Sequence, residues 1–152
     1  MLKVFLALLI FSPAFAHLDA GQDVAVGGYL ADFGHSPGNI SSGESGILAF
    51  NLANVTTGDA LIPQNVWVRI SKGDDVTFAG SFAPHGGSVT FTYLFPEAGV
   101  YTIKARYFGN ESILAEADFA VRIEERASDN TFTTAFLFLL GLFVVILYTG
   151  RY

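Results

Sequence analysis

The histidine at position 17 is the residue of this chain with the most direct route to chemistry. Residues 12–21 read SPAFAHLDAG, in which Ala14 and Ala16 form the Ala-x-Ala signature of an export-signal cleavage site behind a short apolar run. Cleavage after Ala16 makes His17 the first residue of the mature chain. Its α-amine and its ring nitrogen could then chelate one metal ion, and nitrogen ligands of this kind suit Cu(II).

Two further residues are candidates to complete a copper site. His85 lies in the Gly-rich segment 83–87 and would add a second imidazole, while Asp19 could supply an oxygen two residues from the amine. Three nitrogens in a T-shaped or square-planar arrangement favour Cu(II). The alternative is that His17 is only the residue left by the cut and that His85 is an ordinary polar loop residue. The third histidine, His35, is a weaker candidate.

Apolar and polar residues alternate with a period of two, which predicts an all-β domain. The strands and loops of this domain must position the candidate copper ligands. Turn residues interrupt the alternation every 8 to 12 positions, as in a β-sandwich. Seven strands in about 100 residues are typical of a single immunoglobulin-like β-sandwich. The predicted strands cover residues 24–33, 46–52, 65–71, 76–82, 88–95, 100–108 and 113–123.

Two aromatic residues carry more specific expectations. The segment 96–101, PEAGVY, predicts a tyrosine corner, in which Tyr101 hydrogen-bonds back to the preceding turn. Trp67 alternates with Val66 and Val68, so parity places it on the more polar face beside Arg69, unless a bulge shifts it inward. There it either covers the sheet under a loop or contacts a partner.

The predicted strand order also decides which histidines can meet. Successive antiparallel strands alternate in direction, so His17, before the first strand, and His85, between the fourth and fifth, are expected at one end of the domain. His35 follows the first predicted strand and is expected at the other end, about 30 Å away at about 3.3 Å per residue.

The two ends of the chain predict export and a membrane anchor. Residues 1–16 combine Lys3, an apolar run and the cleavage site of a signal peptide. Residues 130–150 are 21 residues without a charge, and at 1.5 Å per residue a helix of that length spans about 31 Å, the thickness of a bilayer core. Arg151 follows it, as the positive-inside rule prefers for a cytoplasmic end.

The predicted organisation is therefore a signal peptide at 1–16, an exported domain at 17–123, a juxtamembrane linker at 124–130, a transmembrane helix at 131–149 and a cytoplasmic tail at 150–152. The expected location is the cell membrane, crossed once, with the domain outside the cytoplasm. A lipid-anchor signal is a poorer fit, because residues 126–130 make a poor polar spacer.

Composition excludes several functional classes. The chain has no cysteine, so disulfides, thiolate metal sites and cysteine nucleophiles are excluded. Its net charge is −6 and it has no basic cluster, so nucleic acid is not expected as a partner. No Ser/His/Asp order, phosphate-binding loop or carboxylate pair in an apolar setting suggests catalysis, and we predict that the protein is not an enzyme.

Three Asn-x-Ser/Thr sequons are candidate glycosylation sites of an exported domain. They begin at Asn39, Asn54 and Asn110, all in predicted loops.

Four segments together resemble the YtkA-like family, small exported immunoglobulin-like domains related in pattern to the CopC group of copper-binding proteins. They are GYLADFGHSP at 28–37, SGESGILAF at 42–50, VWVRI at 66–70 and VTFTYLFPEAGVY at 89–101. The resemblance implies a mature N-terminal histidine that binds Cu(II). The CopC group completes its site with an Asp-x-His element, whereas His85 here follows Ala83 and Pro84.

Two hypotheses for function follow. The first is a membrane-anchored extracytoplasmic domain that binds or hands on copper through His17, with His85 and Asp19. The second is a structural or accessory module that uses a face of the sandwich, and Trp67, to contact another membrane or exported protein. A histidine-brace oxidase is a third, weaker alternative.

Overall fold

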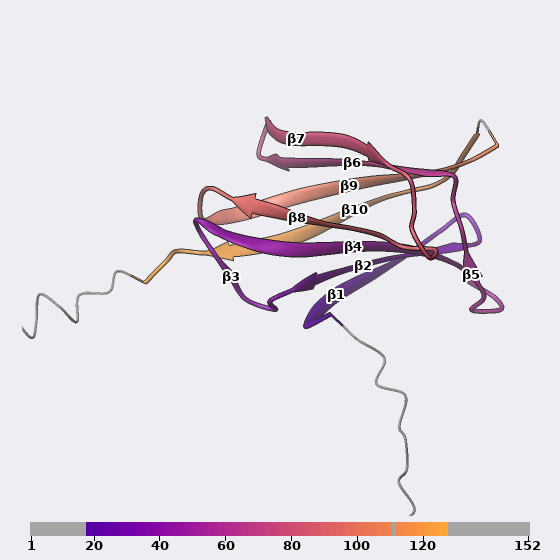
Figure 1. Cartoon of the computed structure of the whole chain (residues 1–152), viewed down its shortest axis with the longest axis horizontal. Helices are drawn as coiled ribbons and strands as arrows, with labels where there is room; N and C mark the ends of the chain where they lie inside the picture. The colour runs from indigo at the N-terminus through magenta and orange to yellow at the C-terminus, as the bar shows by residue number, and fades with distance from the viewer. Residues whose placement is uncertain (1–17, 111, 128–152) are drawn as a thin grey trace, which may run out of the picture.

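The protein is described by a computed structural model that covers residues 18–110 and 112–127 (Figure 1). Every regular element in these ranges is a β-strand, so the predicted all-β class is confirmed. No helix in this part could cross a membrane. The predicted signal peptide, His17 and the predicted transmembrane helix at 131–149 lie outside the described residues.

The strands form two sheets of five. In the first sheet, β1 (Ala20–Val26) pairs with β2 (Tyr29–Ser36), which pairs with β4 (Glu44–Asn54); both β5 (Ala60–Leu61) and β8 (Val89–Phe95) pair with β4. The second sheet has the order β3-β10-β9-β6-β7, with the strands β3 (Ile40–Ser41), β10 (Ser112–Glu124), β9 (Gly99–Gly109), β6 (Asn65–Lys72) and β7 (Asp75–Phe82). Figure 1 shows these long strands running nearly along one axis.

Alternation along the strands places the core between the sheets. On β9, the inward side chains Tyr101, Ile103, Ala105 and Tyr107 are all 0% exposed, and polar residues alternate with them. Aromatic contacts join the two sheets, because the rings of Phe33 on β2 and Phe119 on β10 lie 5.0 Å apart. Side chains that face away from this core make up the outer face of each sheet.

One predicted strand is wrong. Residues 24–33 do not form a single strand; the chain turns back at Gly27 and Gly28, so that β1 and β2 make a hairpin. Both glycines have positive φ, +55° and +89°, a backbone conformation that residues with a Cβ rarely adopt. The other six predicted strands match β4, β6, β7, β8, β9 and β10 to within a few residues, whereas β3 and β5 have only two residues each.

The two aromatic expectations are confirmed. The Tyr101 hydroxyl donates a hydrogen bond of 3.1 Å to the carbonyl oxygen of Glu97, which closes the predicted corner. Val66 and Val68 are fully buried, while Trp67 between them is half-buried on the outer face of the second sheet.

The corner and a second buried tyrosine provide a matched pair of stability tests. Tyr101→Phe removes the bond to Glu97 and should lower the free energy of unfolding by about 1 kcal/mol. Tyr107 is also buried, but its hydroxyl has no partner among the described residues, so Tyr107→Phe should be neutral or stabilising because it removes an unsatisfied polar group. Urea unfolding of both variants measures the difference. Equal losses would contradict the assigned role of the corner.

Candidate functional site

The predicted copper ligands within the described residues do not lie together. Asp19 immediately precedes β1, and its Oδ2 accepts a hydrogen bond of 2.6 Å from the Ser36 hydroxyl. His85 lies in the connection from β7 to β8, where its backbone pairs with that of Ser88. Since β1, β2, β4 and β8 are successive neighbours, three strand spacings of about 4.8 Å separate Asp19 from the β8 edge.

The hairpin also changes the position of His35. Ala20 pairs directly with His35, so the start of the described chain lies beside this histidine and the predicted separation of about 30 Å is wrong. His35 itself is 9% exposed and packs on Phe33, with ring centroids 5.9 Å apart. Its Nδ1 lies 3.0 Å from the Pro37 carbonyl oxygen. Because a carbonyl only accepts, Nδ1 must carry the proton, and the ring is held as part of the core.

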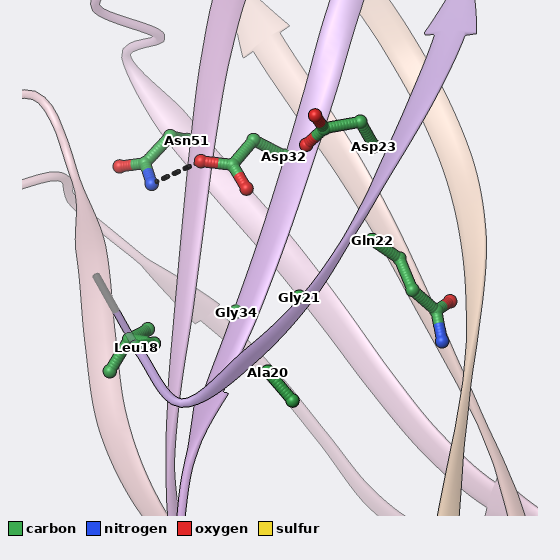
Figure 2. Close-up of a pocket in the computed structure, with 8 residues that line it drawn as sticks. All are labelled: Leu18, Ala20, Gly21, Gln22, Asp23, Asp32, Gly34 and Asn51. Atoms are coloured by element: carbon green, nitrogen blue, oxygen red, sulfur yellow. Dashed lines mark hydrogen bonds between the residues drawn. The ribbon is translucent and has the colours of Figure 1, made fainter. Parts of the chain in front are cut away.

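A row of polar side chains crosses the outer face of the first sheet. Asp23 on β1 pairs with Asp32 on β2, which pairs with Asn51 on β4. Figure 2 shows the two carboxylates side by side, with the Asn51 side chain next to Asp32. The Asn51 amide nitrogen donates a hydrogen bond of 2.9 Å to Asp32 Oδ2. We call Asp23 and Asp32 the acid pair; Asn51 is the amide beside it.

The acid pair lies between two hollows of the same face. One hollow, of about 360 Å³, extends toward Leu18 and Gly34 (Figure 2). The other, of about 340 Å³, extends toward Gly86 and Gly87 in the His85 loop. Asp23, Asp32 and Asn51 line both hollows. Together they form a polar groove with the residue after His17 at one end and the residue after His85 at the other.

Electrostatics make the acid pair unfavourable when it is fully ionised. Partial burial, the negative charge of Asp32 and a hydrogen bond with Asp32 all raise the pKa of Asp23. Like charges directly opposite on neighbouring strands destabilise a sheet. The pair can therefore hold a proton or a cationic group. Within the described ranges, no cluster of three or more His, Cys, Asp or Glu side chains could hold a metal ion.

The acid pair was missed by the sequence analysis, although a signal was available. Gly-Gly between two alternating runs is typical of a two-residue hairpin turn. Placing that turn at Gly27 and Gly28 pairs Asp23 with Asp32.

A neutral substitution tests the raised pKa of Asp23. Folded Asp23 keeps its proton to higher pH than in the unfolded chain, so stability falls as pH rises from the unfolded pKa through the raised folded pKa. Asp23→Asn should therefore stabilise the protein at pH 7 by about 0.5 kcal/mol, a small effect because the side chain is largely exposed. The gain should disappear toward pH 3. Thermal unfolding against pH measures it, with Asp59→Asn on an exposed turn as the control; equal gains in both variants would contradict the pairing.

The outer face of the second sheet has a different charge pattern. Register places Trp67 beside Arg106 and Arg106 beside Glu116, and in the next row Arg69 beside Lys104 and Lys104 beside Asp118. Arg122 and Glu124 follow on the same face of β10. We call this surface the charged face; it comprises Trp67, Arg69, Lys104, Arg106, Glu116, Asp118, Arg122 and Glu124. It carries four of the six Lys and Arg residues in the described part of the chain.

Most charged side chains of the charged face form ion pairs with one another. Lys104 Nζ lies 2.8 Å from Glu116 and 3.0 Å from Asp118, and Arg106 also pairs with Glu116. Hydrogen bonds from Lys104 and Arg106 lower the pKa of Glu116. The Arg106 guanidinium lies 5.0 Å from the centre of the Trp67 ring, a cation–π contact. These contacts keep Trp67 and its neighbours in a defined arrangement.

Arg69 and Arg122 take part in none of the ion pairs found within residues 18–110 and 112–127, and Arg69 differs from Arg122 in lying directly beside the like-charged Lys104. The Nε of Arg69 is buried and has no hydrogen-bond partner there. A buried donor without a partner costs free energy, which an incoming acceptor could recover. Arg69 is therefore the group of this face most suited to bind an anion.

The three sequons differ in their surroundings. Asn39 is exposed between β2 and β3. Asn54 is half-buried at the end of β4, and its side-chain oxygen accepts hydrogen bonds from the backbone nitrogens of Thr56 and Thr57. The side-chain oxygen of Asn110 accepts a hydrogen bond of 2.7 Å from Gln64. Glycosylation at these positions stays a prediction.

Comparisons with known proteins do not show a family for this chain. No family model and no curated protein matches it. Its fold is similar to part of a β-glucosidase from Listeria innocua, solved alone and in complex with glucose. In both cases the TM-score is 0.37 and the identity 14%, over 64% of this chain and 16% of that chain. The resemblance to the YtkA-like family therefore stays a prediction.

Proposed function

We propose that this protein is a membrane-tethered, extracytoplasmic immunoglobulin-like β-sandwich that acts as a binding module without catalytic activity. Support for the tether comes from the signal-peptide pattern at 1–16 and the uncharged segment 130–150. The strand orders β2-β4-β8 and β10-β9-β6-β7 support an immunoglobulin-like arrangement. An accessory module of another membrane or exported protein fits this organisation best.

The charged face is the observation that carries this proposal. The whole chain has a net charge of −6, yet this face holds four cations, Arg69, Lys104, Arg106 and Arg122, against three anions, Glu116, Asp118 and Glu124, a difference of +1. Separation of charge of this kind directs association with a partner of opposite sign. The expected partner presents carboxylates to Arg69 and an apolar group to Trp67, because Trp and Arg dominate protein interfaces.

Trp67 allows a direct test, because it is the only tryptophan of the chain. Poly-L-glutamate serves as a defined anionic probe. Its addition at low salt should change Trp67 fluorescence in a saturable way, and salt should weaken the binding because exposed charges are screened. Arg69→Gln should weaken it about fivefold to tenfold, the loss of one charge-assisted contact.

Lys72→Gln is the matched control for this measurement. Lys72 pairs with Glu97 outside the charged face, so its neutralisation changes the net charge equally and should leave the affinity of poly-L-glutamate nearly unchanged. If the two substitutions weaken binding equally, net charge explains the binding and the charged face is not its site.

Copper binding is the second candidate, and the groove is the observation that favours it. Leu18, next to His17, and Gly86, next to His85, line hollows that share the acid pair. A Cu(II) ion chelated by the amine and imidazole of His17 would find carboxylates along this groove. Asp19 would contribute less than predicted, because its carboxylate already bonds to Ser36.

An N-terminal extension tests the copper hypothesis. The protein purified from membranes is first weighed to show that it begins at His17, and Cu(II) is then titrated against a competing chelator. One Ala placed before His17 separates the amine from the imidazole chelate and should weaken Cu(II) binding at least about tenfold. Equal affinities for the two chains, or a mature chain that begins elsewhere, would exclude the His17 chelate.

A further inference from the structure

One side of the domain is nearly free of charge. Residues 76–96 span β7 after its first residue, Asp75, the His85 loop and β8, and they contain no Asp, Glu, Lys or Arg. The domain otherwise has charged residues on both outer faces and at both ends. Val76 on β7 and Leu94 on β8 are 55% and 54% exposed. We call this surface, formed by β7 and β8, the neutral side.

Both strands of the neutral side are sheet edges. Within the described ranges β7 pairs only with β6, and β8 pairs only with β4. Edge strands in monomeric proteins usually carry Lys, Pro or inward charges that block pairing with another chain. Neither β7 nor β8 contains Lys, Pro or an inward charge, and the single charge on these strands is Asp75, exposed at the first residue of β7. On the opposite side of the sandwich the two sheets are joined by hydrogen bonds. The Gln22 side-chain amide on β1 bonds to both the backbone nitrogen and the backbone oxygen of Ala120 on β10.

Aromatic side chains fill the space between the two edges. Phe78 and Phe82 of β7 contact Phe91 and Tyr93 of β8, and the closest pair, Phe82 and Phe91, stacks with centroids 4.5 Å apart. All four are only half-buried. The seam between the sheets is thus apolar and partly open to solvent on this side.

The same contacts show how β7 and β8 run relative to each other and which of their residues lie at the same height along the strands. Phe82 contacts Phe91, and Phe78 contacts Tyr93 as well as Phe91. Since residue numbers rise along β7 as they fall along β8, the two strands are antiparallel. With Phe78 opposite Tyr93, Ala79 is level with Thr92, and both side chains are exposed.

We propose that the occupant of the neutral side is a second copy of this chain, with β7 of one copy pairing with β8 of the other. A two-fold axis parallel to the strands brings β7 against the partner's β8 and β8 against the partner's β7, both antiparallel. Each pairing joins a sheet of one copy to a sheet of the other, and the half-open aromatic seams close on each other. Such an interface is self-complementary, as a two-fold dimer requires.

Charge and topology favour a second copy as the occupant. Two molecules of net charge −6 repel one another over most of their surface, and the neutral side is where contact avoids like charges. An axis parallel to the strands leaves both C-terminal ends on one side, as two chains in one membrane need. This choice of axis rests on the membrane tether of the proposed function. A rotation about the same axis keeps each residue at its own level, so Ala79 meets Thr92 of the other copy.

The absence of cysteine makes this register testable by disulfide formation. Full-length Ala79→Cys and Thr92→Cys chains with different tags are co-expressed, and their membranes are oxidised mildly. A mixed disulfide dimer should form at least about tenfold more than with the matched pair Ala79→Cys and Ala120→Cys, because disulfides need Cα atoms within about 7 Å. Yields equal to the control pair would overturn the proposal. A stronger dimer of Ala79→Cys with itself would also overturn it, since that requires an axis perpendicular to the strands.

A charged edge gives a second, independent test. Thr92→Lys should convert the full-length protein in detergent from dimer to monomer in sedimentation while the chain stays folded, because Lys on an edge strand blocks pairing. Thr102→Lys, exposed on the outer face of the second sheet, should remain a dimer. A monomeric unmodified protein would overturn the proposal and leave the neutral side to a strand of a different protein.

Alkaline carbonate extraction separates this inference from the tether. If the chain resists extraction but shows no disulfide between positions 79 and 92, the membrane tether is supported and the dimer is overturned. If the chain is extracted but still forms that disulfide, the dimer is supported and the tether is overturned.

Discussion

Burial of alternating side chains between two sheets is the constraint on which the rest of this structure depends. The chain has no cysteine, so no disulfide holds the sheets together. Their attachment rests on apolar and aromatic contacts such as Phe33 with Phe119 and Phe95 with Tyr101. Inward positions are then mostly apolar, with His35 and Ser71 as the buried polar residues, and the intervening residues are turned outward. The chemistry of the protein is therefore confined to the outer faces and the edges.

Those outer surfaces divide by charge. The first sheet presents Asp23 and Asp32, the second presents most of the cations, and the neutral side between them has Asp75 at one end of β7 as its single charge. The two charged surfaces differ in how their charges are satisfied. On the second sheet the ion pairs leave only Arg69 with a buried, unpartnered Nε, whereas on the first sheet Asp23 and Asp32 face each other with an amide as their neighbour. Each surface thus has one feature that an external group could complete.

The hairpin at Gly27 and Gly28 shows where reading the sequence failed. Residues 24–33 alternate well enough to suggest one strand, because a two-residue turn preserves the alternation on both of its sides. The error had a large consequence: reversing β1 moved Asp19 away from the His85 edge and beside Ser36, and it created the pair of Asp23 and Asp32. A misplaced turn changes few residues locally but exchanges all the neighbours of a strand.

The sequence by itself determined the all-β class, six of the strands, the buried side of β9, the outward position of Trp67 and the corner at Tyr101. These depend on alternation and turn chemistry, which act over a few neighbouring residues. Only the tertiary structure decided that Asp23 faces Asp32, that Arg69 lies beside Lys104 with no ion-pair partner among the described residues, and that β7 and β8 are neighbouring edges. Contacts of this kind join residues far apart in the chain, and they follow from strand order and register, which no local pattern records.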